Sequence, residues 1–263
     1  MPNCYNDGMI TPILIGLVGW VTGTFVNYLS DVLPHKRRLT QPFCLNCSLE
    51  QPFLDYFVWP RKCQACDSRR SFRVWFVEIL AVPITIWLWY SPPEPLGFWV
   101  GLFLLAFFAV VIVIDIEHRL ILHPVSIFGA IVGLGIGTWL NGLQLTLLGG
   151  AAGFGIMLVL YLGGILFAKV VSRLKGRDLD EEALGFGDVN LSGVLGLMLG
   201  WPVIFAGLFI AILAGAIISI ILMIGMLITR KYRTFVAIPY GPFLVAGAIF
   251  LIYFREFILA HFG

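Results

Sequence analysis

The chain has 263 residues, of which 59% are hydrophobic and only 12% are charged, and its formal net charge is +2. Soluble proteins carry about 25% charged residues, so this composition excludes an ordinary soluble domain. The small net charge says nothing about nucleic acid, and we expect no nucleic-acid partner.

Eight apolar segments follow one another along the chain, and they are continuous rather than alternating. Because about 20 apolar residues span a bilayer, we predict an all-α polytopic membrane protein of about eight transmembrane helices, with membrane lipid around it. The first segment is too long for the apolar core of a signal peptide, so we expect a retained helix. The sixth is short and flanked by glycine, which favours a tilted or re-entrant helix. The segments are residues 10–29, 75–90, 98–114, 125–140, 145–170, 189–199, 201–229 and 236–260.

Basic residues concentrate in the loops that follow the odd-numbered segments. These loops, together with Lys169 at the end of the fifth segment, hold 16 of the 17 Lys and Arg residues, and only Arg255 falls elsewhere. Loops rich in Lys and Arg stay on the cytoplasmic side of a membrane. We therefore predict that all the odd-to-even loops are cytoplasmic, including the long loop after the first segment.

That long loop contains two Cys-x-x-Cys pairs separated by fifteen residues. The pairs are Cys44 with Cys47 and Cys63 with Cys66, and this spacing is typical of a four-thiolate zinc site. Disulfides are rare in the cytoplasm, so metal is favoured over bridges, with two reduced or redox-active pairs as the alternative. Four protein ligands leave no open position on the metal. We therefore expect structural zinc in a small cytoplasmic domain.

Two aspartates stand at the borders of apolar segments. Asp115 ends the third segment, and Asp188 begins the sixth. The loop orientation puts both at the cytoplasmic border, so we expect the two carboxylates to meet there and to share a proton. The alternatives are that Asp115 pairs with Arg119 or His118, and that Asp188 stabilises the start of a helix.

Glycine and proline surround these acids. Gly185 and Gly187 flank Phe186 just before Asp188, and they let another helix or a substrate strand approach closely. Pro239, Gly241 and Pro242 break the last apolar segment, and a broken helix exposes backbone groups that can shape a groove. We predict that these five glycines and prolines position the substrate.

Six motifs, taken in order, resemble those of the type IV prepilin peptidases. These are the bifunctional leader peptidase/N-methyltransferases of type IV pilus and type II secretion systems, and the resemblance covers nearly the whole chain. The matching stretches are Gly-Thr-Phe-Val-Asn at 23–27, the two cysteine pairs, Glu78, Ile-Asp-Ile-Glu-His at 114–118, the GxGD motif at 185–188, and Pro-Tyr-Gly-Pro-Phe at 239–243.

The resemblance implies a GxGD-type aspartyl protease of the bacterial inner membrane, with Asp115 and Asp188 as its catalytic residues. Such an enzyme cleaves the leader of prepilins or pseudopilins after a glycine, on the cytoplasmic side and just before an apolar helix. N-methylation of the new amino terminus with S-adenosylmethionine would follow. We divide the chain accordingly into a first transmembrane helix (1–32), a zinc-binding domain (33–74) and a membrane-embedded protease domain (75–263).

The chain also departs from the family pattern. Asn190 stands where the family usually has Lys, and Val32 stands where it has Arg. Two other functions are compatible with paired acids, namely a transporter or ion-conducting protein and a catalytically idle family member. Transport sites usually lie near the bilayer midplane between repeats. Here both acids lie at a border and no repeat is visible, which favours the peptidase.

Overall fold

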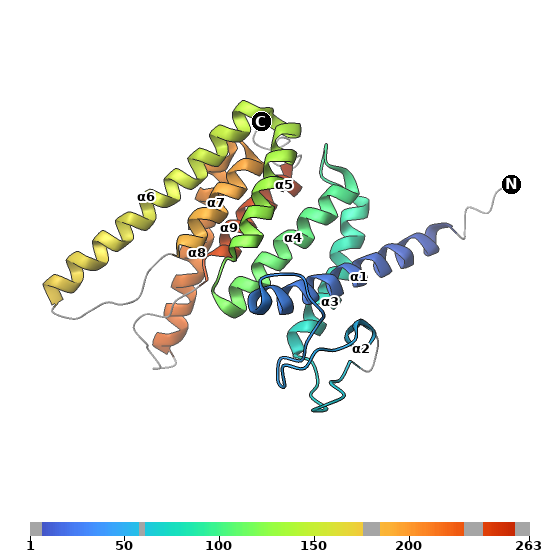
Figure 1. Cartoon of the computed structure of the whole chain (residues 1–263). Helices are drawn as coiled ribbons and strands as arrows, with labels where there is room; N and C mark the ends of the chain where they lie inside the picture. Colours follow the sequence, from blue (N-terminus) through green and yellow to red (C-terminus); the bar gives the residue numbers. More distant parts are fainter. Residues whose placement is uncertain (1–6, 58–60, 176–184, 229–238, 256–263) are drawn as a thin grey trace. The chain divides into compact units, whose positions relative to one another are not determined.

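The structure is a computed structural model that describes residues 7–57, 61–175, 185–228 and 239–255 (Figure 1). These residues are helical apart from connecting loops, and their β pairing is limited to two isolated bridges. The helices within these ranges are α1 (Asp7–Lys36), α2 (Phe53–Phe57), α3 (Phe72–Tyr90), α4 (Gly97–His118), α5 (His123–Asn141), α6 (Leu143–Lys175), α7 (Phe186–Leu199), α8 (Val203–Ile228) and α9 (Gly241–Tyr253).

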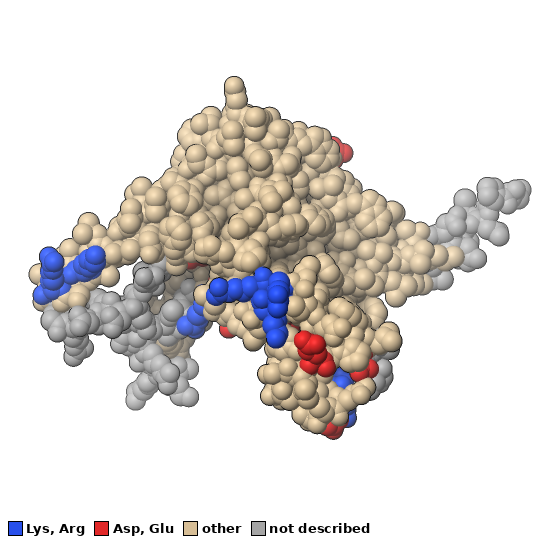
Figure 2. All heavy atoms as spheres, in the orientation of Figure 1, with Lys and Arg blue, Asp and Glu red and all other residues tan. Residues whose placement is uncertain are grey.

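Six of these helices are long and apolar enough to cross a bilayer, namely α1, α3, α4, α5, α6 and α8. The prediction of an all-helical, multi-pass membrane protein is confirmed. Two of the predicted segments form shorter apolar helices, α7 with 14 residues and α9 with 13. Most of the visible surface carries no charged side chain (Figure 2), which is what a lipid-facing surface requires.

Glycines set both ends of α7. Gly185 is its N-cap, and Gly200 ends it with a φ of +74°, a left-handed conformation that favours glycine. The apolar pattern continues beyond Gly200 into α8, so hydropathy alone does not mark this boundary. The glycine-flanked sixth segment is therefore a short helix, too short to span a bilayer of about 30 Å at 1.5 Å per residue.

The chain forms two compact units, residues 1–113 and 114–263. In the first unit α1 packs along α3, and Gly23 makes this possible because a Cβ there would lie 2.9 Å from the Cα of Glu78. The loop between these helices carries α2. Tyr56 of α2 is buried against Phe43 of the loop and against Tyr28 and Val32 of α1, so the loop shares a small core with α1.

In the second unit α7 lies among α5, α6 and α9 (Figure 1). Its backbone touches that of α6 where glycines face each other. A Cβ on Gly149 would collide with the carbonyl of Gly196, and a Cβ on Gly153 would collide with the carbonyl of Ser192. Small residues let membrane helices approach this closely and gain packing contacts. Most residues of α7 are buried, including Val189, Leu191, Leu195 and Met198.

We expect Gly153→Ala to destabilise the protein by about 1–3 kcal/mol, because the added methyl group overpacks the contact between α6 and α7. Gly155→Ala is the matched control, since a Cβ at Gly155 meets nothing within 4 Å. That variant should be neutral, or more stable by up to about 1 kcal/mol. Denaturant unfolding in detergent measures both. Equal stability of the two variants would show that the glycine contact contributes nothing.

Candidate functional site

Asp188 lies in the first turn of α7 and is 8% exposed. Its Oδ2 accepts a hydrogen bond of 3.2 Å from the backbone N–H of Gly185. The carboxylate thus caps the start of its own helix, where the helix dipole favours negative charge. Gly187 packs on the loop after α4, where a Cβ on this glycine would lie 2.9 Å from the Cβ of Ile121.

Asp115 lies in the last turn of α4 and is 4% exposed. Its Oδ2 accepts a hydrogen bond of 3.0 Å from the backbone N–H of Gly241. A Cβ on Gly241 would lie 2.6 Å from that same oxygen, so only glycine lets the donor reach the carboxylate. Pro242 follows in the first turn of α9, where a missing N–H costs nothing.

The end of α4 and the starts of α7 and α9 therefore meet around two buried carboxylates. Asp115 and Asp188 lie within electrostatic range of each other, and Tyr240 lies within range of Asp188. Two carboxylates held close together in a site of low polarity cannot both carry a full charge. Such a pair keeps one proton between them and can act as acid and base at once.

The five residues predicted to position the substrate have different surroundings in the structure. Gly185 and Gly241 each donate a backbone hydrogen bond to one of the acids, and Gly187 packs on Ile121. Pro239 and Pro242 are half-buried. Sequence reasoning missed the role of Gly241 as a donor to Asp115, although a glycine before a proline at a helix start was a usable signal.

The four cysteines of the loop form a compact cluster. Their sulfurs all lie within 4.8 Å of one another, with Cys44 Sγ 3.6 Å from Cys66 Sγ and Cys47 Sγ 3.6 Å from Cys63 Sγ. Bonded sulfurs would be about 2.05 Å apart, so these are free thiols. A tetrahedral zinc ion with bonds of about 2.3 Å requires sulfurs about 3.8 Å apart. The cluster therefore fits a metal ion of that kind.

Each cysteine pair is held by the same backbone turn. Ser48 N–H donates to the Cys44 carbonyl and Asp67 N–H to the Cys63 carbonyl, at 2.8 and 2.9 Å. Ser48 and Asp67 both have positive φ. The backbone N–H groups of Cys66 and Ala65 lower the pKa of the Cys63 thiol to about 6, which favours the thiolate that binds metal. The sequence predicted the cluster.

A buried ion pair ties the cysteine loop to its two helices. Arg61 Nη1 donates to both carboxylate oxygens of Glu78, at 2.8 and 2.7 Å, and the two side chains are 3% and 2% exposed. Glu78 also accepts from Trp20 and Asn27. Nearby, Asp31 accepts from Tyr56 and Arg73. Hydropathy gave no signal for these partners, because they lie up to 58 residues apart.

The fold and these clusters define a multi-pass helical membrane protein with a buried pair of acids and a four-thiol site suited to a metal ion. Residues 102–220, which include both aspartates, match the sequence model of the type IV leader peptidase family. Similar proteins are the prepilin leader peptidase/N-methyltransferases of Pectobacterium carotovorum subsp. carotovorum (26% identity, covering 90% of each chain), Legionella pneumophila (28%, 84% of this chain and 75% of the relative) and Bacillus subtilis strain 168 (26%, 89% and 87%).

The chain is thus similar to the type IV leader peptidase family over residues 102–220 and to prepilin leader peptidase/N-methyltransferases over most of its length. The resemblance drawn from the six motifs is thereby confirmed. No solved structure matches the chain significantly.

We expect the purified protein to contain about one equivalent of zinc per chain, because four clustered thiolates bind zinc tightly. Elemental analysis of the protein and of Cys63→Ser, which removes one ligand, checks this. Cys4→Ser is the control, since Cys4 is the one cysteine outside the two pairs. Wild-type protein without zinc, or equal zinc in Cys63→Ser, would contradict the metal site.

We expect Glu78→Gln to destabilise the protein by about 3–5 kcal/mol, because it leaves the buried Arg61 guanidinium without its countercharge. Glu94→Gln is the control, as Glu94 is exposed in the connection after α3. The free energy of unfolding in detergent distinguishes the two. A loss below about 1 kcal/mol for Glu78→Gln would show that the ion pair does not hold the loop.

Proposed function

We propose that this protein is a membrane-embedded aspartyl peptidase that removes the leader of type IV prepilins or pseudopilins. The observation that carries the proposal is the pair of buried, interacting carboxylates of Asp115 and Asp188. Each of them stands in a motif that resembles the family pattern, and each is fixed by one backbone N–H group. The names of the curated relatives supply the leader and the prepilin.

In the mechanism that we infer, one carboxylate is ionised and the other is protonated. The ionised one takes a proton from a water molecule, whose oxygen attacks the scissile carbonyl carbon. The protonated one donates a hydrogen bond to the carbonyl oxygen. The C–N bond then breaks as the amine nitrogen receives a proton from the pair. The roles belong to the pair and not to one residue.

The backbone donors prepare the two carboxylates for these roles. Gly241 and Gly185 each bind the Oδ2 atom of one acid. Within the described part of the chain neither Oδ1 atom accepts a hydrogen bond, and we assign these two atoms to the water and the substrate. A carboxylate fixed by a backbone group needs little rearrangement during the reaction, which is the main source of electrostatic catalysis.

The cytoplasmic orientation is also part of the proposal, and it rests on the distribution of Lys and Arg. Arg177, Arg230, Lys231 and Arg233, which contribute to it, lie outside the described residues. We place the protein in the bacterial inner membrane. In this orientation the cysteine loop and the acid pair lie on the cytoplasmic side. The division of the chain into a first transmembrane helix (1–32), a zinc-binding domain (33–74) and a protease domain (75–263) is part of the same proposal.

The names of the relatives also include an N-methyltransferase activity, and this is the support for methyl transfer by this chain. Such an activity implies S-adenosylmethionine as the methyl donor. A cavity of about 220 Å³ lies beside the cysteine cluster, lined among others by Asp31, Arg61 and Arg73. Small-molecule sites measure roughly 300–1,000 Å³, so this cavity does not hold the whole cofactor in the conformation described. We assign methyl transfer to the chain without assigning residues to it.

We expect Asp115→Asn and Asp188→Asn each to reduce prepilin cleavage by at least about 10²-fold, because each removes one member of the acid–base pair. The assay follows leader removal from a purified prepilin in detergent by mass spectrometry. Asp67→Asn is the control, because Asp67 is an exposed acid of the cysteine loop. Cleavage that persists in both dyad variants would remove the proposed mechanism.

A further inference from the structure

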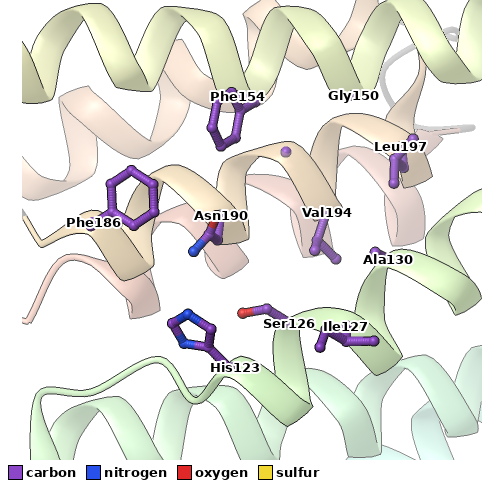
Figure 3. Close-up of a pocket in the computed structure, with 11 residues that line it drawn as sticks. His123, Ser126, Ile127, Ala130, Gly150, Phe154, Phe186, Asn190, Val194 and Leu197 are labelled. Atoms are coloured by element: carbon purple, nitrogen blue, oxygen red, sulfur yellow. The ribbon is translucent and has the colours of Figure 1, made fainter.

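A groove of about 440 Å³ runs between α5, α6 and α7 (Figure 3). Most of it is apolar, with Ile127 of α5, Phe154 of α6, and Val194 and Leu197 of α7 along its walls. The side chain of Ile127 is 63% exposed. It lies on α5, a helix long and apolar enough to cross the membrane. The groove is thus an apolar surface that another apolar group can cover.

Each of the three helices contributes a small residue to the groove, which widens it. Ala130 lines the groove from α5, Gly150 from α6 and Gly193 from α7. Helices associate in membranes where such residues let backbones approach closely. The groove is therefore shaped for an object as wide as a helix, rather than for a side chain alone.

One end of the groove is polar. His123, Ser126 and Asn190 lie together there, and the hydroxyl of Ser126 points into the groove (Figure 3). Within the described part of the chain, this hydroxyl is buried and has no hydrogen-bond partner. A buried polar group without a partner is costly. The ligand that fills the groove can supply the missing partner.

The polar end lies next to the acid pair along the chain. Asn190 is two residues after Asp188, and His123 is two residues after Ile121, which packs on Gly187. At 3.6 residues per turn, the groove-lining residues of α7 share one face and Asp188 faces the opposite side. A chain that leaves the groove at this end must therefore cross the first turn of α7 to reach Asp188.

We propose that this groove holds the apolar helix of the prepilin substrate, with the amino-terminal end of that helix at His123, Ser126 and Asn190. The proposal rests on the proposed peptidase function, in which the cut bond precedes an apolar helix. The first turn of any helix has backbone N–H groups without partners. Ser126 Oγ, the amide oxygen of Asn190 and a ring nitrogen of His123 can accept hydrogen bonds from them.

This placement sets where the chain is cut. A helix is about 10 Å wide, so about three extended residues at roughly 3.3 Å each are needed to pass the first turn of α7. Gly185 and Phe186 are exposed there, and a Cβ on Gly185 would meet only ordinary contacts. The scissile bond therefore lies on extended chain, about three residues before the bound part of the helix.

A lipid acyl chain is the other object that can fill an apolar groove in a membrane. It matches the apolar walls equally well, but it does not present a row of N–H donors to the polar end. Nothing in a lipid acyl chain would fix its end beside the acid pair. The two occupants make different products in a cross-linking experiment, which separates them directly.

The test places a photo-cross-linking amino acid at Ile127 of the full chain carrying Asp115→Asn, so that bound prepilin is not consumed. Ile221 of α8, 57% exposed and outside the groove-lining residues, is the control position. We expect a cross-link to the apolar helix of the prepilin from position 127 and little from position 221. Lipid adducts alone at position 127, or equal prepilin cross-linking from both positions, would overturn the proposal.

A second test blocks the groove without touching the acid pair. Ala130→Phe should raise the KM for prepilin at least about fivefold through steric exclusion. Gly135→Phe on the same helix should leave KM unchanged, because a Cβ there meets nothing within 4 Å. If wild-type protein cleaves prepilin and both variants match it, the groove proposal fails and the peptidase function stands. If wild-type protein cleaves no prepilin, the proposed function fails first.

Discussion

The structure of the second unit depends on the hydrogen bonding of two carboxylates that are nearly withdrawn from solvent. A buried acid is costly unless it has partners, and both acids here obtain one from the backbone start of a helix. Asp188 uses the start of its own helix and Asp115 uses the start of α9. The end of α4 and the starts of α7 and α9 therefore converge on the two acids.

Glycine makes this convergence possible in two distinct ways. Along α6 and α7, glycines bring two backbones into contact and so fix the depth of a short, buried helix. At Gly241 a glycine admits a carboxylate oxygen to its own N–H. The first role is general in membrane helix packing. The second is specific to the acid, because any side chain at that position would displace Asp115.

Much of this arrangement could be predicted from the sequence, because hydropathy, cysteine spacing and the resemblance each depend on residues that are near one another in the chain. The all-helical membrane fold, the four-cysteine cluster and the resemblance to the family were predicted, whereas two of the eight expected transmembrane segments are helices of only 14 and 13 residues. The partners of Asp115 and of Arg61 could not be predicted, since they depend on packing between separate segments, whereas the contact of Asp188 with the start of its own helix was among the alternatives that the sequence offered. The short α7 was expected from its flanking glycines, whereas the volume and lining of the groove required side-chain positions.

The bond between Gly241 and Asp115 joins residues 126 positions apart. During synthesis the aspartate enters the membrane long before its partner leaves the ribosome. The acid pair thus acquires its final geometry only after α9 has been inserted. On the proposed mechanism, a nascent chain therefore cannot cleave a prepilin before α9 is in place.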